Sequence, residues 1–244
     1  MALYALATMN LFYLPQLGPE NLALLTQEEA AHALQVLRLR QGDQLVVVDG
    51  RGTWAEAVIE QIHGKQCQIS IHSRKPGWGL PSYGLHVAMA PTKQIDRFEW
   101  FIEKATEIGI TSITPLLCDH SERKEVKHER LMRVAVAAMK QSMKAWHPTL
   151  LPMTRFDDFL LNETEGIKCI AHCREGEKES LWNAIQPTKS TTILIGPEGD
   201  FSQEEIMHAI QAGYHQVSLG YSRLRTETAG VVATHTVTLK NGTW

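Results

Sequence analysis

The pattern of apolar and polar positions predicts a β-rich module in the first 75 or so residues. Short apolar runs alternate with glycine turns, at Gly50-Arg-Gly52 and near Gly64. Short strands at this spacing, joined by glycine turns, are typical of a small barrel. The predicted strands are 44–49, 54–59 and 67–71.

One helix is predicted inside this module. Thr26 and Glu29 have the spacing of a capping box, in which each side chain bonds the backbone N–H of the other residue. The helix that follows would place Ala30, Leu34 and Leu37 on one apolar face.

Beyond residue 80 the pattern changes to strands that alternate with helices. Such alternation predicts a parallel sheet that is covered by helices on both faces. The helix 94–108 has a clear apolar stripe, formed by Phe98, Phe101, Ile102, Ala105 and Ile108. The other predicted elements are strands 85–90, 112–118, 167–173, 191–195 and 216–219, a long helix 122–145, and helices beginning near Ser202 and Thr226.

A segment at residues 74–84 separates the two patterns. It contains two prolines and three glycines, which is the composition of a linker. We therefore predict two domains, with residues 1–78 forming the barrel and residues 79–244 forming the α/β part. We also expect residues 1–8 to be non-native, with the natural chain beginning at Met9.

Composition narrows the class of protein. Hydrophobic residues make up 43% and charged residues 21%, and the formal net charge is -3. That charge argues against indiscriminate binding of nucleic acid, although a local basic patch remains compatible with it. No apolar run approaches the ~20 residues of a membrane span, so we expect no membrane partner and a cytoplasmic protein.

The four cysteines are too few for a disulfide scaffold and form no Cys-x-x-Cys pair. Cys169, His172 and Cys173 have a spacing that invites a metal interpretation. In a strand, however, Cys169 and Cys173 would share one face while His172 would point to the other. We therefore expect no metal site and reduced thiols.

A glycine-rich junction between a strand and a helix occupies residues 192–202. Gly196 and Gly199 permit close backbone approach or positive φ, and Ser202 with Glu205 forms a capping box. The junction lacks the Gly-Lys-Ser/Thr ending of a phosphate loop, and it is not a dinucleotide fingerprint. Carboxylates at 198 and 200 would repel phosphate, so we expect a neutral or cationic ligand.

A second junction follows at residues 218–230. Gly220 ends a strand, and Arg223, Arg225 and Glu227 come directly after it. Open parallel sheets bind ligands at the carboxyl ends of their strands. The two junctions together therefore predict one ligand pocket, although this polar cluster alone would also fit a surface ion-pair group.

Ile-Gly-Pro-Glu-Gly-Asp-Phe at 195–201, followed by Leu-Gly-x-x-x-Leu-Arg-Thr-Glu-Thr-Ala at 219–229, resembles the bacterial 16S ribosomal RNA uridine-N3 methyltransferases. That family belongs to the SPOUT methyltransferases. The similarity continues upstream at 36–40, 42–43, 49–52, 104–109 and 141–142.

The resemblance implies a trefoil-knotted α/β domain preceded by a PUA-like barrel. It also implies S-adenosyl-L-methionine as cofactor, 16S rRNA of the small ribosomal subunit as partner and substrate, and a homodimer. The cofactor-binding residues carried over by position are Ile195, Gly196, Pro197, Glu198, Gly199, Leu219, Gly220, Leu224 and Arg225.

The chain departs from the family pattern in two places. Tyr221-Ser222 stands where the family commonly has proline-arginine, and Arg223 is expected to supply the missing cation. Gln141-Ser-Met-Lys144 stands where a glycine-arginine ending is usual. Lysine lacks the planar fork of arginine, so this departure bears on the RNA contact near Lys144 and not on the cofactor site.

Methylation of uridine N3 requires a base that is unpaired or flipped out. We predict Arg225 as the cation that stabilises the developing uracil anion, and Glu227 as its orienting partner or as the base. A purely structural role stays open for both residues. The predicted RNA-binding residues are Arg38, Arg40, Arg51, Arg123, Lys127, Arg130, Lys144 and Arg223.

Two other functions stay open. The first is a related SPOUT methyltransferase that acts on the ribose 2′-oxygen or on transfer RNA. The second is a ribosome-assembly factor that binds RNA without catalysis.

Overall fold

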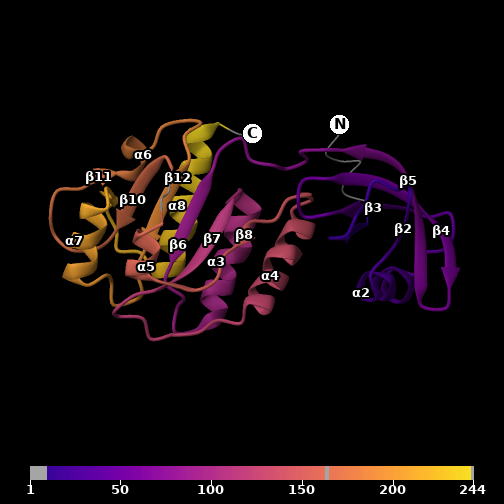
Figure 1. The fold of residues 1–244 in the computed structure, drawn as a ribbon, viewed down its shortest axis with the longest axis horizontal. Coiled ribbons are helices and arrows are strands. Elements are labelled where there is room, and N and C mark those ends of the chain that lie inside the picture. The colour runs from indigo at the N-terminus through magenta and orange to yellow at the C-terminus, as the bar shows by residue number, and fades with distance from the viewer. Residues whose placement is uncertain (1–9, 163–164, 243–244) are drawn as a thin grey trace. The chain divides into compact units, whose positions relative to one another are not determined.

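The computed structural model describes residues 10–162 and 165–242, so the prediction about residues 1–8 lies outside the described residues. The chain forms two compact units. One runs to Leu80 and takes in Met139–His147, and the other comprises Pro81–Ala138 with the chain from Pro148 onward. Figure 1 draws the elements of both units. The predicted division into domains at residue 78 stays a prediction.

The first unit contains a five-stranded sheet in the order β1-β3-β4-β5-β2. β1 pairs with β3 in parallel, and the other pairs are antiparallel. The three predicted strands are confirmed, but β1 and β2 were missed because three residues are too few to show alternation. The bounds are β1 Leu11–Tyr13, β2 Leu22–Leu24, β3 Gln44–Val48, β4 Trp54–His63 and β5 Gln66–Lys75.

The helix of this unit begins as predicted and then changes type. Thr26 accepts a hydrogen bond from the Glu29 amide at the start of α2 (Gln27–Ala31). The Glu29 carboxylate accepts instead from the Tyr13 amide and from Lys140, so only half of the predicted capping box forms. The chain continues as the π-helix η1 (His32–Val36), whose wider turn exposes Leu37. The prediction that Leu37 lies on the buried face was therefore wrong.

The segment Met139–His147 completes the first unit. The rings of Trp54 and Trp78 pack with centroids 4.9 Å apart. The Trp78 indole N–H donates to the Met143 carbonyl, and the Gly52 amide donates to the Ala145 carbonyl. Part of the predicted linker is therefore packed within the first unit rather than free.

The second unit contains an eight-stranded sheet whose strands pair in parallel, as the alternation of strands and helices predicts. The order is β11-β13-β10-β12-β6-β7-β8, with β9 also paired to β7. The bounds are β6 Leu85–Met89, β7 Ser112–Leu117, β8 Thr149–Leu150, β9 Thr154–Arg155, β10 Ile167–Ala171, β11 Glu179–Ser180, β12 Thr191–Ile195 and β13 His215–Ser218.

Helices cover both faces of this sheet, which confirms the predicted α/β class (Figure 1). Alternate residues of one strand enter opposite cores, as Ile193 and Leu194 do on β12. No helix among the described residues has the length and apolar character needed to cross a membrane. One core contains α3 (Ile95–Ile108), α4 (His128–Gln141), α6 (Leu181–Ala184) and α8 (Thr226–Asn241); the other contains α5 (Phe156–Leu160) and α7 (Gln203–Gln211).

The predicted long helix 122–145 is wrong at both ends, because α4 covers only His128–Gln141. Before it, the Arg123 guanidinium donates to the carbonyls of Thr92 and Lys93, which fixes a loop rather than a helix. After it, Met143 has φ +54°, in the left-handed region that interrupts a helix. Arg123 and Lys127, which the predicted helix contained, therefore precede the observed one.

Candidate functional site

A cavity of about 720 Å³ opens at the carboxyl ends of β10, β12 and β13. β10 lies between the other two strands in the sheet, so their C-terminal loops converge at one edge. Both glycine-rich junctions line this cavity, as their position after parallel strands predicts.

Most of the predicted cofactor residues lie together in the cavity wall. Gly199 is the exception, because it lies against the His120 side chain and does not line the cavity. The predicted residues that line the cavity are Ile195, Gly196, Pro197, Glu198, Leu219, Gly220, Leu224 and Arg225, together with Arg223 and Glu227.

The first junction is held by its own polar groups. A Cβ at Gly196 would lie 3.1 Å from the Phe201 amide, so close approach rather than positive φ explains this glycine. Asp200, at φ +65°, donates its amide to the Pro197 carbonyl. Ser202 and Glu205 form both bonds of the predicted capping box at the start of α7.

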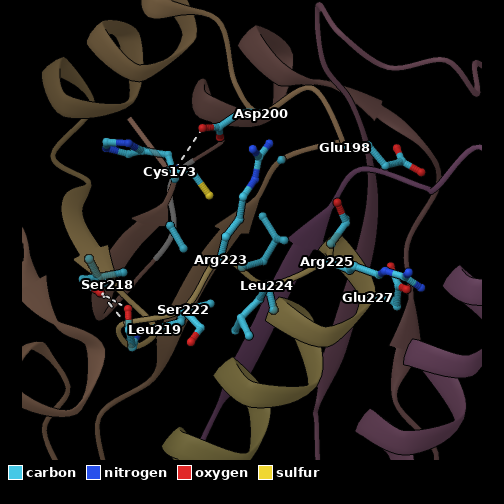
Figure 2. A pocket seen from close by; sticks show the side chains of 18 of the residues that line it. Cys173, Glu198, Asp200, Ser218, Leu219, Ser222, Arg223, Leu224, Arg225 and Glu227 are labelled. Atoms are coloured by element: carbon cyan, nitrogen blue, oxygen red, sulfur yellow. Dashed lines mark hydrogen bonds between the residues drawn. The ribbon is translucent and has the colours of Figure 1, made fainter. Parts of the chain in front are cut away.

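The two acidic residues of this junction line the cavity, and each carboxylate also accepts hydrogen bonds from backbone amides. Glu198 Oε1 accepts from the Lys93 amide at 3.0 Å, and Figure 2 shows its side chain directed away from Arg223. Asp200 Oδ2 accepts from the Cys173 amide at 2.8 Å, and Oδ1 accepts from Phe201. The acidic loop therefore shapes the wall, and its charge is partly balanced by these donors.

The second junction brings charged groups to the start of α8. Arg225 is the N-cap residue and Glu227 lies in the first turn, where the helix dipole favours negative charge. The Glu227 side chain is only 9% exposed, and its Oε1 lies 3.9 Å from Arg97 Nε. Among the described residues its Oε2 has no hydrogen-bond partner.

The other side of the cavity carries a second charged group. Figure 2 shows the Arg223 side chain extending toward Cys173 and Asp200, while Arg225 and Glu227 lie apart from them at the helix start. Lys178 also lines the cavity and donates to the His172 carbonyl. Burial lowers the pKa of the His172 imidazole, which favours its neutral form.

The prediction that Cys169 and Cys173 share a face was wrong. β10 ends at Ala171, so the alternation that it assumed stops before Cys173. Cys169 is fully buried in the core, and burial raises the pKa of its thiol to about 12. Cys173 is exposed and lines the cavity.

Several cavity residues were missed because the loop after β6 was not considered, and because His172 and Cys173 after β10 were assessed only as metal ligands. Arg97 lies in the first turn of α3, after β6, and His172, Cys173 and Lys178 follow β10. Both strands are neighbours of β12, so the rule that placed the two junctions together applies to these loops as well. That rule is the signal that would have found them.

The predicted RNA-binding residues are divided between the units. Arg130 on α4 already pairs with Asp96 and Glu99, and Arg123 is bonded to backbone carbonyls. Arg38, Arg40 and Arg51 are exposed in the first unit, where Lys144 packs against Gly79. Lys127 and Arg223 are exposed in the second unit. Their roles in binding RNA stay predictions.

Two protein families match the chain. Residues 80–238 match a family described as an RNA methyltransferase domain, and residues 25–71 match one described as an RNA methyltransferase PUA domain. Ribosomal RNA small subunit methyltransferase E of Synechocystis is 30% identical over 221 residues, which cover 88% of this chain and 72% of the relative.

Solved structures agree with this assignment. A probable rRNA-methyltransferase from Porphyromonas gingivalis is 39% identical, with a TM-score of 0.90 over 96% of this chain and 99% of that one. Ribosomal RNA small subunit methyltransferase E from Neisseria gonorrhoeae, bound to S-adenosyl methionine, is 26% identical with a TM-score of 0.80 over 93% and 95%. The first unit thus contains a PUA domain, and the chain belongs to the RNA methyltransferase family.

Proposed function

We propose that this protein transfers a methyl group from S-adenosyl-L-methionine to N3 of a uridine in 16S rRNA of the small ribosomal subunit. The observation that carries the proposal is the cavity shared by the two glycine-rich junctions, whose sequences resemble those of the uridine-N3 methyltransferases. Membership in the RNA methyltransferase family supports it, as do relatives named for the small subunit.

The residues of the cavity fit this cofactor. S-adenosyl-L-methionine carries a positive sulfonium, an ammonium and a carboxylate on an adenosine body. The wall combines apolar side chains such as Leu219 and Leu224 with charges of both signs, including Asp200 and Arg223. Gly196, Pro197, Glu198, Gly220 and Arg225 would hold the cofactor together with the two leucines.

The proposed chemistry requires removal of the uracil N3 proton. When bound, S-adenosyl-L-methionine supplies the methyl group on a good leaving group. Arg225 would face a uracil carbonyl and stabilise the negative charge that develops as the N3–H bond breaks. Glu227 would orient Arg225 or accept the proton, and both side chains line the cavity.

Positioning supplies the remaining part of the mechanism. N3 takes part in Watson–Crick pairing, so the target base must leave its helix before it enters the cavity. The PUA domain, with exposed Arg38, Arg40 and Arg51, would bind the flanking RNA through phosphate contacts. We further propose a trefoil knot in the second unit, a homodimer and a cytoplasmic location, which the resemblance to the family implies.

The test is methylation of small ribosomal subunits and of free 16S rRNA by the purified protein, followed by mass analysis of the nucleosides. We expect N3-methyluridine among the nucleosides of the treated RNA. We also expect this modification to be absent from the rRNA of cells that lack the gene. A 2′-O-methylated nucleoside, or methylation of transfer RNA alone, would favour the related SPOUT activities. Absence of cofactor binding in calorimetry would favour a non-catalytic assembly factor.

A further inference from the structure

Two contacts hold α3 against α8 beside the cavity. A Cβ at Gly230 would lie 2.6 Å from Phe101 ring carbons, so α8 approaches α3 closely only because this residue is glycine. Arg97 lies four residues before Phe101, and Glu227 lies three residues before Gly230. Each is thus one helical turn earlier on its own helix, and the two side chains meet there at 3.9 Å.

The Glu227 carboxylate has an incomplete set of partners. The side chain is nine-tenths buried, and within the described parts of the chain Oε2 accepts no hydrogen bond. A buried oxygen without a donor carries a desolvation cost, so the neighbouring charge of Arg97 matters for holding this carboxylate in place. Uracil N3–H is a donor, and both Arg97 and Glu227 line the cavity that would receive it.

We infer that Arg97 is a positioning residue for methyl transfer: its guanidinium, 3.9 Å from Glu227 Oε1, orients the Glu227 carboxylate at the cavity so that this carboxylate can accept the N3 proton of the substrate. This inference rests on the proposed function. Arg97 comes from α3 and Glu227 from α8, so the fold and not the local sequence creates the pair. Arg225 lies at the same helix end as Glu227 and keeps the role proposed for it above.

The test compares Arg97→Met and Arg97→Lys in the full-length protein. Arg97→Met should lower kcat for methyl transfer at least tenfold, while KM for RNA and the calorimetric Kd for S-adenosyl-L-methionine change less than twofold. Arg97→Lys should recover part of kcat, because it restores a cation near Oε1. Lys104→Met is the matched control, since it removes an ion-paired cation from the same helix away from the cavity and should leave kcat unchanged.

A double-mutant cycle with Glu227→Gln separates positioning from an independent role. If Arg97 acts through Glu227, adding Arg97→Met to Glu227→Gln should cause no further loss of kcat. A crystal structure of the unliganded Arg97→Met variant should show the Glu227 carboxylate displaced, which is a readout independent of activity. The inference would be overturned if the losses of kcat in the two single variants multiplied in the double variant. It would also be overturned if the Glu227 carboxylate kept its position in Arg97→Met, or if Arg97→Met kept the full kcat.

The outcomes also distinguish this inference from the proposed function. If the wild-type protein methylates no ribosomal RNA, the proposed function fails before any variant is compared. If the wild type is active and Arg97→Met is equally active, only the inference fails. Thermal unfolding of each variant identifies any loss of kcat that comes from loss of the fold.

Discussion

The Asp200 carboxylate accepts a hydrogen bond from the Cys173 amide at 2.8 Å, which ties the loop after β12 to the end of β10. Asp200 also occupies the left-handed region at φ +65°, which aspartate tolerates better than most residues. One side chain therefore fixes both the turn and its distance from the neighbouring strand, and with them the shape of one cavity wall.

Asp200→Ala should weaken binding of S-adenosyl-L-methionine by about tenfold, since it removes a charged hydrogen bond and a residue suited to this backbone. Asp200→Asn keeps an acceptor and tolerates the same φ, so its loss should be smaller. Isothermal titration calorimetry of the two variants gives the comparison. Equal affinity in wild type and Asp200→Ala would show that this tie does not shape the cofactor site.

Glu227→Gln should lower kcat by about a hundredfold or more if the carboxylate accepts the N3 proton. Glutamine keeps the shape and the acceptor oxygen but cannot take up a proton at neutral pH. Cofactor affinity should stay close to that of the wild type. Single-turnover methyl transfer measures the effect, and full activity would exclude Glu227 as the base.

Gly230→Ala should destabilise the protein by about 1–3 kcal/mol, because the added methyl group overlaps the Phe101 ring in a packed core. Alanine is the better helix former, so a packing clash must outweigh a gain in helix propensity. Urea unfolding measures the change. Adding Phe101→Leu should recover part of the loss, whereas strictly additive effects would argue against a clash between these two residues.

Stability should fall as the pH is lowered, because a partly buried histidine in the second unit must then take up a proton. Burial lowers the pKa of His86 on β6 to about 4, below the value of about 6.5 expected in the unfolded chain. The neutral form therefore stabilises the fold; this contribution is complete above about pH 6.5 and is lost as the pH falls toward 4. Between pH 7.5 and pH 5 the loss should be about 2 kcal/mol.

Urea unfolding of His86→Gln at the two pH values checks this assignment. Glutamine can still bond Thr114, the hydrogen-bond partner of the His86 ring, but it does not titrate in this range. The variant should lose this part of the pH dependence, whereas His63→Gln, at an exposed position, should retain it. An unchanged pH dependence in His86→Gln would assign it to other groups.

Local pattern predicted much of this fold, because each long element carries its own signal. The stripe of Phe98, Phe101 and Ile102 and the capping box at Ser202 both appear where the sequence places them. The errors arose where tertiary contacts override that signal. Arg123 is drawn to distant carbonyls, and Glu29 bonds Lys140 instead of its own helix end.

The sequence predicted only part of the candidate site. The two junctions follow strands 191–195 and 216–219, and glycine, proline and arginine mark them in the sequence. Arg97 carries no such mark, because its pairing with Glu227 depends on two helices that are far apart in the chain. The identities of the functional residues and the RNA-binding surface stay predictions.

Because Met139–His147 belongs to the first unit, some contacts of that unit can form only late in synthesis of the chain. Residues up to Leu80 leave the ribosome first. The Trp78 indole donates to the Met143 carbonyl and the Gly52 amide donates to the Ala145 carbonyl, and both acceptors are synthesised much later. The first unit therefore cannot complete its native contacts until about sixty more residues have been translated. A fragment that ends at Leu80 would lack those partners and should be more easily cleaved by proteases than the same residues in the full chain.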